Sequence, residues 1–240
     1  MQDPMRIPGV LDAVRRVWEG QPDLPLPTLF GVLANRGIGW GASDEDLLRE
    51  LSAMERAHPG MLPLVDARVT ARFLLLTEAP GHRVMVDPWR VVVRRPEVSA
   101  QPGVWHYATI RPAFVGSPLV VTSAEGIDHR LGVLSSITLL DDMPEPTVPD
   151  LTGLNRRGMG DAVYLITLAD GAAMVLSHGL DHFTAGRRRL EHETSSWESL
   201  RTCRPGAGLV VQGPGGGPAR EYGVVQDIVL LENSPQDSTG

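Results

Sequence analysis

The sequence contains no lysine, because all 22 basic side chains among its 240 residues are arginine. A lysine contacts phosphate in a P-loop, forms Schiff bases with carbonyl substrates and pairs with ATP phosphates in protein kinases. Its absence excludes these enzyme classes. Together with 26 glycines and 20 prolines, the exclusive use of arginine is typical of GC-rich codon choice, and we interpret the chain as bacterial.

Cysteine is nearly absent as well, since Cys203 is the only one. A single cysteine forms no disulfide framework, no Cys-x-x-Cys pair and no thiolate-rich zinc or iron–sulfur site. The sequence also lacks the apolar run of a signal peptide at its start and any run of about 18 apolar residues. We therefore expect a cytoplasmic protein in a reducing compartment, with no membrane partner.

Aromatic residues make up only 5% of the chain and charged residues 21%, against 42% apolar residues and a net charge of −7. This is the composition of a folded protein rather than of a disordered one. The length suffices for one large domain or for two to three small ones. No segment is strongly basic, so a nucleic-acid partner is not expected.

The strongest helix signals lie within residues 1–62. Apolar residues recur at three- and four-residue spacing over 11–18, and a second helix is predicted at 28–36. Ser43 resembles the N-cap of a third helix that ends before Pro59. Three short helices followed by strands are the layout of a winged helix, so we predict a winged-helix-like module here.

A winged helix raises the alternative of a DNA-binding transcriptional regulator. However, the predicted third helix begins with Asp44, Glu45 and Asp46, whose carboxylates repel phosphate from the helix N-terminus. We therefore favour a helical module that binds protein, or that packs on the rest of the chain.

After residue 62 the sequence changes to short β-branched runs separated by glycine and proline, which are typical of strands and hairpins. Blocks of the segment 63–142 recur in the same order in the segment 158–232, about ninety residues later. The matches include Leu74–Gly81 with Tyr164–Gly171, Trp105 with Trp197, Gly116 with Gly206, Leu119–Val121 with Leu209–Val211, and Gly132 with Gly223. We therefore predict two tandem copies of one β unit.

The predicted fold class is α+β. It consists of an N-terminal three-helix winged-helix-like module and two tandem copies of a small antiparallel β unit, SH3-like or a curled sheet, related by pseudo-twofold symmetry. The glycine at the start of each last strand is expected to mark a bulge or bend. Residues 143–157 are proline-rich and acidic and predict a semi-rigid linker, and the polar residues 233–240 predict a disordered tail.

The densest group of ionisable side chains lies in the second copy and contains His178, Asp181, His182, Glu191 and His192. Imidazole and carboxylate groups are ligands of zinc and iron. These residues therefore define one alternative, a metal-dependent hydrolase or small-molecule binder. The segment matches no metalloenzyme motif, so we favour a solvated loop and expect no metal and no cofactor.

Arginine runs are the second candidate site. Their planar guanidinium groups are suited to phosphate or to a carboxylate-rich partner, whereas charged protection of a strand edge is the competing interpretation. The candidate binding residues are Arg94, Arg95, Arg187, Arg188 and Arg189.

Tryptophan and cysteine are two further residue types that can take part in binding or chemistry. Trp105 and Trp197 are interpreted as core-packing residues, because equivalent aromatic residues in duplicated β units usually fill cores. Arg201 and Arg204 lie beside Cys203 and are of a type that lowers a thiol pKa. No sequence feature directs a histidine toward this cysteine.

No set of nucleophile, base and oxyanion donors emerges from the sequence. We therefore expect a non-catalytic protein-binding or adaptor component of a cytoplasmic bacterial assembly. Its partner is expected to be another protein, bound through the N-terminal helices or the β edges. The sequence identifies no specific small-molecule ligand.

Overall fold

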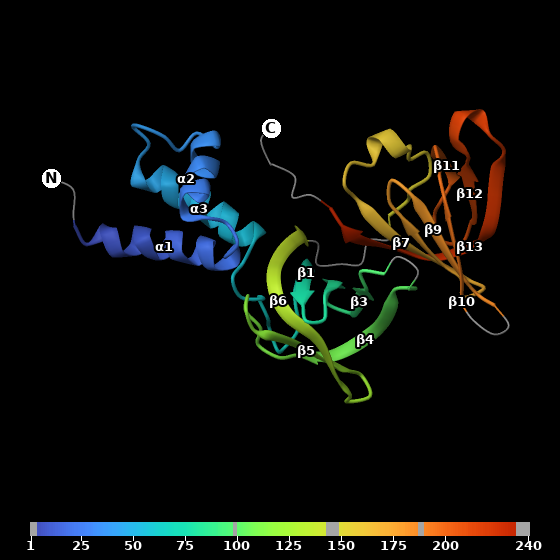
Figure 1. Ribbon diagram of the computed structural model, residues 1–240, viewed down its shortest axis with the longest axis horizontal. Helices are drawn as coiled ribbons and strands as arrows, with labels where there is room; N and C mark the ends of the chain where they lie inside the picture. Colours follow the sequence, from blue (N-terminus) through green and yellow to red (C-terminus); the bar gives the residue numbers. More distant parts are fainter. Residues whose placement is uncertain (1–3, 98–99, 143–148, 187–189, 234–240) are drawn as a thin grey trace. The chain divides into compact units, whose positions relative to one another are not determined.

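Figure 1 shows the computed structural model of the protein, which describes residues 4–97, 100–142, 149–186 and 190–233. These residues form two compact units. Unit 1 comprises residues 4–96 and 102–142, and unit 2 comprises residues 149–233 with the short stretch around residue 100.

Unit 1 begins with three helices, α1 (Arg6–Gly20), α2 (Leu26–Asn35) and α3 (Asp44–Ala57). The Ser43 hydroxyl accepts a hydrogen bond from the Asp46 N–H, and the Asp46 carboxylate accepts one from the Ser43 N–H. The predicted N-cap is therefore confirmed as a capping box. The helices enclose their own small core, which includes Val17, Leu29, Leu33 and Leu51.

The described residues of the helical module contain no strand of their own, since the first strand of the chain belongs to the barrel that follows. The three predicted helices are confirmed, whereas the winged-helix similarity stays a prediction. Over the part of the chain that the structure describes, none of the helices has the length and apolar character needed to cross a bilayer.

The rest of unit 1 is a closed antiparallel barrel of six strands. The strands are β1 (Arg72–Glu78), β2 (His82–Val86), β3 (Arg90–Arg94), β4 (Gly103–Ile110), β5 (Pro118–Ser123) and β6 (Asp128–Asp141). Each strand pairs with the next, and β6 returns to pair with β1. Because side chains alternate between the two faces of a strand, one set fills the barrel core, including Leu75, Val84, Val91, Leu119 and Ile137.

Unit 2 is a seven-stranded antiparallel sheet with the order β10-β9-β8-β7-β13-β12-β11. The strands are β7 (Val163–Leu168), β8 (Ala173–Leu176), β9 (Leu180–Ala185), β10 (Leu190–Ser195), β11 (Ser199–Thr202), β12 (Gly208–Gln212) and β13 (Ala219–Glu232). Its core includes Ile166, Met174, Leu176, Leu200 and Leu209.

The two β units share one order of strand pairing. β7 pairs with β8 and β13, as β1 pairs with β2 and β6. The first half of β4 pairs with β3 and its second half with β5. In unit 2 these pairings are divided between β10, which pairs with β9, and β11, which pairs with β12. A break at residues 196–198 therefore accounts for the extra strand.

Gly116 and Gly206, matched from the sequence, also have the same backbone conformation, with φ of 90° and 78°. The Gly116 N–H donates to the Leu134 carbonyl at 2.7 Å, and the Gly206 N–H donates to the Val225 carbonyl at 2.8 Å. The carbonyl of the residue after each glycine accepts the return bond from Leu134 or Val225, at 2.9 Å in both units. This matched block therefore describes one local structure that occurs twice.

The gapless match of the first hairpins is wrong by one residue. Leu75 pairs with Ile137, and Ile166 pairs with Ile228, so Leu75 corresponds to Ile166 and not to Leu165. The cross-strand partner of Leu75 is Val84, whereas that of Ile166 is Met174, so the turn of unit 2 is one residue shorter. A slip of one residue moves a strand's side chains to its other face.

The match between the two tryptophans also needs correction. Trp197 is buried, and its indole N–H donates to the Ser177 carbonyl at 2.8 Å. In unit 1 the corresponding residue is Tyr107, which is buried and donates its hydroxyl to the Asp87 carbonyl at 2.9 Å. Trp105 packs half-buried against the barrel core. Core packing is thus confirmed for both tryptophans, but they are not equivalent.

The predicted linker, residues 143–157, and the predicted tail, residues 233–240, lie partly outside the described residues. The described end of the linker belongs to unit 2. Leu151 is buried there, and its N–H donates to the Cys203 carbonyl at 2.9 Å. This end of the segment is therefore part of a core rather than a free spacer.

Candidate functional site

The histidine cluster of unit 2 is divided between two faces of the β9–β10 hairpin. On one face, His192 Nε2 lies 3.0 Å from an Asp181 carboxylate oxygen, which also accepts a 2.6 Å hydrogen bond from the Thr194 hydroxyl. The His192 ring stacks on Phe183 with ring centroids 4.7 Å apart. Asp181 and His192 thus serve as mutual partners on the sheet surface.

The remaining members of that cluster do not join this pair. His182 is paired with Glu193 in the ladder and so points to the opposite face, where its ring contacts Tyr222 at 5.2 Å. His178 and Glu191 are exposed. In the described ranges, no three His, Cys, Asp or Glu residues are placed to hold a metal ion.

The candidate arginines lie in different environments. Arg94 lies at the end of β3 opposite Arg83 of β2, and burial, with the Arg83 charge adding to it, lowers the pKa of Arg94 to about 10. Arg95 is exposed. Arg187, Arg188 and Arg189 lie outside the described residues. Of the five arginines, the structure therefore places only Arg94 and Arg95, and gives them different environments.

The expectation for Cys203 is wrong in direction. Its side chain is fully buried, and burial, together with the Asp150 carboxylate, raises the pKa of the thiol to about 12. The neighbouring Arg201 and Arg204 are exposed, so their charges are screened by water. Cys203 is a core residue and not a nucleophile.

Unit 1 has a groove of about 790 Å³ between the helices and the barrel. The connection from α3 into the barrel fixes its position. The Val115 N–H donates to the Gly60 carbonyl at 2.9 Å, and Met61 and Phe114 form a β-bridge. Gly20, at the end of α1, lies so close to the backbone of this connection that a Cβ at residue 20 would be 2.1 Å from the His58 carbonyl oxygen.

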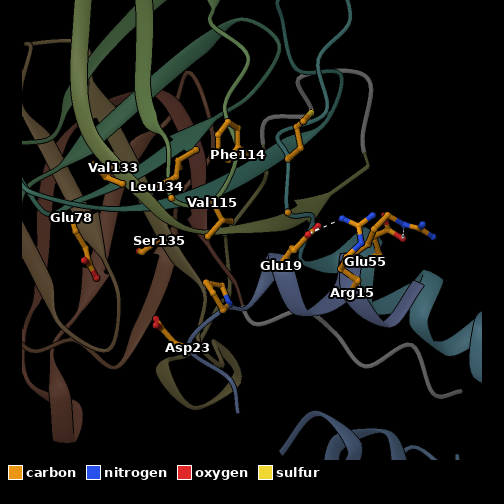
Figure 2. A pocket seen from close by; sticks show the side chains of 15 residues that line it. Arg15, Glu19, Asp23, Glu55, Glu78, Phe114, Val115, Val133, Leu134 and Ser135 are labelled. Atoms are coloured by element: carbon orange, nitrogen blue, oxygen red, sulfur yellow. Dashed lines mark hydrogen bonds and ion pairs between the residues drawn. The ribbon is translucent and has the colours of Figure 1, made fainter. Parts of the chain in front are cut away.

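The floor of the groove is apolar and exposed (Figure 2). Met61 is 61% exposed, Phe114 is 53% exposed and Val133 of β6 is 36% exposed. Val115 and Leu134 continue this surface. Single exposed apolar residues are ordinary, but several in one concave site are not, so this floor is the candidate for a binding surface.

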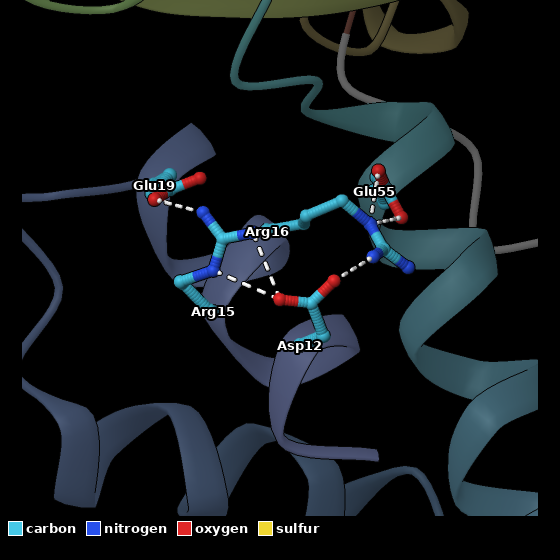
Figure 3. Close-up of polar contacts among 5 residues, drawn as sticks. All are labelled: Asp12, Arg15, Arg16, Glu19 and Glu55. Atoms are coloured by element: carbon cyan, nitrogen blue, oxygen red, sulfur yellow. Dashed lines mark hydrogen bonds and ion pairs between the residues drawn. The ribbon is translucent and has the colours of Figure 1, made fainter. Parts of the chain in front are cut away.

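One side of the groove carries a network of ion pairs from α1 and α3, shown in Figure 3. Arg15 bonds to Asp12 at 2.9 Å and to Glu19 at 2.8 Å, and Arg16 bonds to Asp12 at 3.1 Å and to Glu55 at 2.9 Å. Hydrogen bonds from Arg15 are the main reason that the pKa of Asp12 is lowered. Both guanidinium groups are therefore already paired with carboxylates.

The groove also has two acidic side chains away from that network. Asp23, between α1 and α2, and Glu78, at the end of β1, both line it and are exposed. In Figure 2 they lie on the same side as Val133 and Ser135, opposite Arg15 and Glu55. No ion pair of either carboxylate is found within the described ranges.

Sequence reasoning missed this groove. Its lining comes from five separate stretches of the chain, and residues such as Met61 and Phe114 carry no motif. The available signal was weak: Met61 follows Gly60 after the predicted third helix, and Phe114 and Val115 precede Gly116. Comparison of the sequence with protein-family models and with curated proteins finds no match.

Proposed function

We propose that the protein is a non-catalytic protein-binding or adaptor component, and that the groove of unit 1 receives a segment of its partner. The observation that carries the proposal is the apolar floor formed by Met61, Phe114 and Val133, whose side chains remain accessible. Burying such side chains is the main source of binding free energy in protein recognition.

The paired β units belong to the same proposal. Their common order of strand pairing, and the repeated hydrogen bonds of Gly116 and Gly206, support duplication of one SH3-like unit. Unit 2 has a groove of its own, of about 650 Å³, but none of its lining residues is an exposed large apolar side chain. This proposal therefore assigns binding to the groove of the first copy, beside which the helical module packs. The second copy serves as a structural counterpart.

The test compares two substitutions at corresponding positions. Val133 follows Gly132 in unit 1, and Val224 follows Gly223 in unit 2; they are 36% and 46% exposed. Val133→Glu places a charge on the groove floor, whereas Val224→Glu places the same charge on a similarly exposed site of the other unit. Circular dichroism and thermal unfolding establish that both variants fold.

Affinity capture from the native host, quantified by mass spectrometry, gives the readout. We expect a protein captured by the wild type and by Val224→Glu to be reduced at least about tenfold with Val133→Glu, the typical penalty for disrupting a central contact. The purified partner must show the same difference in direct titration. Equal capture by all three proteins, no specific capture, or capture of nucleic acid in place of protein contradicts the proposal.

A further inference from the structure

We infer that the segment which the groove accepts is an apolar peptide carrying an arginine or lysine. This inference rests on the proposed function, because it names the chemistry of the partner for the same groove. It is drawn from the charges around the floor rather than from the floor itself.

The lining of the groove contains four carboxylates and two guanidinium groups. The carboxylates are Glu19, Asp23, Glu55 and Glu78, and the guanidinium groups are Arg15 and Arg16. The excess of negative charge creates a local potential that attracts cations and repels anions. A partner with complementary charge is therefore steered toward this surface.

The arginines do not offset this potential for an incoming ligand. Arg15 is held between Asp12 and Glu19, and Arg16 is held between Asp12 and Glu55. Binding of an acidic group to either arginine would require one of these ion pairs to break. The free energy lost with that pair would offset the free energy gained from the new one. Asp23 and Glu78, in contrast, can accept hydrogen bonds from a new donor without losing an ion pair described for them. A guanidinium group binds a carboxylate with two parallel hydrogen bonds.

The volume of the groove agrees with part of a short peptide segment. Its volume of about 790 Å³ lies within the roughly 300–1,000 Å³ of sites that hold compact organic ligands. The apolar floor requires apolar side chains on the peptide, and the acidic side requires a cation beside them. An acidic peptide lacks the cation, and a nucleic acid lacks both the cation and the aliphatic side chains.

Three fluorescent decapeptides test the inference against full-length protein. They share the same leucine, valine and phenylalanine residues and differ only in carrying arginine, serine or glutamate at two alternate positions. Fluorescence anisotropy measures binding to the wild type, to Val133→Glu and to the double variant Asp23→Asn/Glu78→Gln. A second double variant, Asp66→Asn/Glu191→Gln, changes the net charge equally at exposed residues that do not line the groove.

We expect the arginine peptide to bind the wild type most tightly and the glutamate peptide least tightly. Asp23→Asn/Glu78→Gln should weaken the arginine peptide about fivefold, the size expected for two exposed ion pairs, and leave the serine peptide within twofold. Asp66→Asn/Glu191→Gln should change neither. Added salt should reduce the preference for arginine, because exposed charges are screened.

The outcomes separate the two proposals. If the arginine and serine peptides bind equally, or if Asp23→Asn/Glu78→Gln leaves the arginine peptide unchanged, the charge inference is overturned, while loss of binding in Val133→Glu still supports the groove. If the glutamate peptide binds best, the inference is also overturned. If no peptide binds, or if Val133→Glu binds all three as the wild type does, the proposed function of the groove itself falls.

Discussion

The fourth strand differs between the two β units and changes the architecture of each. In unit 1, β4 runs without interruption through Trp105, His106 and Tyr107 and closes the barrel. In unit 2 the corresponding chain is divided into β10 and β11 around Trp197, and the sheet stays open. One order of strand pairing therefore produces two different closures.

Local hydrogen bonds explain why the open form is stable. The Leu200 N–H donates to the Leu154 carbonyl at 2.8 Å, and the Gly153 N–H donates to the Leu200 carbonyl at 2.7 Å. Residues before β7 thus pair with β11 on the side that lacks a neighbouring strand in the sheet. Residues of the same chain thus occupy backbone hydrogen-bonding groups at the β11 edge, which limits the pairing of this edge with another protein. The binding proposed for the groove of unit 1 needs no such edge.

The largest expected difference between the units concerns Gly132 and Gly223. Gly132 has a φ of 100°, and a Cβ there would lie 2.5 Å from the Pro80 carbonyl oxygen. Gly132→Ala should therefore destabilise unit 1 by about 3 kcal/mol, from left-handed strain and overpacking together. At Gly223 the nearest atom to a Cβ is an Asp170 carboxylate oxygen at 3.3 Å, so Gly223→Ala should cost about 1 kcal/mol or less.

Hydrogen exchange read by mass spectrometry measures the two effects separately, since core amides of each unit report its own opening free energy. Gly132→Ala should accelerate exchange of the barrel core amides of unit 1 and leave those of unit 2 unchanged. Equal losses for the two substitutions would show that both units make the same bend, and the contrast drawn between them would be wrong.

These two glycines also show how far the sequence predicts the fold. Pattern and capping signals located all three helices, including the Ser43 cap, because these signals act within a few residues. The repeated blocks located the β units and a matched glycine in each last strand, but Gly132 and Gly223 are the fifth residues of β6 and β13 rather than the first. A β-bulge is confirmed beside both glycines, because the ladder shifts register between Val133 and Arg130 in unit 1 and between Val224 and Glu221 in unit 2. Of the two glycines, only Gly132 has a positive φ. The same residue at two matched positions therefore does not have the same backbone conformation.

The candidate site was less predictable than the fold, for a physical reason. His178 through His192 are close in sequence, but strand alternation sends His182 and His192 to opposite faces. The groove has the reverse character, since Met61, Phe114 and Val133 are far apart in sequence. They meet through the Met61–Phe114 bridge and the pairing of the chain before β5 with β6. A surface assembled in this way leaves no local pattern to find.

A smaller effect tests the correspondence of Tyr107 with Trp197. Trp197→Phe removes the hydrogen bond to Ser177 and leaves a cavity, and should destabilise unit 2 by about 2 kcal/mol. Tyr107→Phe removes the bond to Asp87 with no loss of ring volume, and should destabilise unit 1 by about 1 kcal/mol. Exchange of the β2–β3 and β8–β9 turns measures both losses.

Trp105→Phe provides the control, because this half-buried side chain packs against the barrel core without holding that turn. It should leave exchange of the β2–β3 turn close to the wild type. If Trp105→Phe instead accelerates exchange of the β2–β3 turn and Tyr107→Phe does not, then Trp105 is the counterpart of Trp197, as the sequence match predicted.

The smallest expected effect is a pH response confined to unit 1, the unit that carries the helices. His58 ends α3, and its Nδ1 lies 3.3 Å from the Thr138 hydroxyl of β6. Burial, mainly, lowers the pKa of His58, and the Arg36 charge adds to this. The unfolded chain, with an ordinary histidine pKa of about 6.5, then binds the proton more readily than the folded protein does. The contribution of His58 to the stability of unit 1 is therefore fully present above about pH 6.5 and falls as the pH drops below it.

Exchange measured between pH 7.5 and 5.5, corrected for the intrinsic amide rate, should show this loss in α3 and β6. His58→Gln should flatten the response, whereas His178→Gln, at an exposed residue of unit 2, should leave it unchanged. An equal response in His58→Gln and wild type would place the proton-sensitive group elsewhere and remove this distinction between the units.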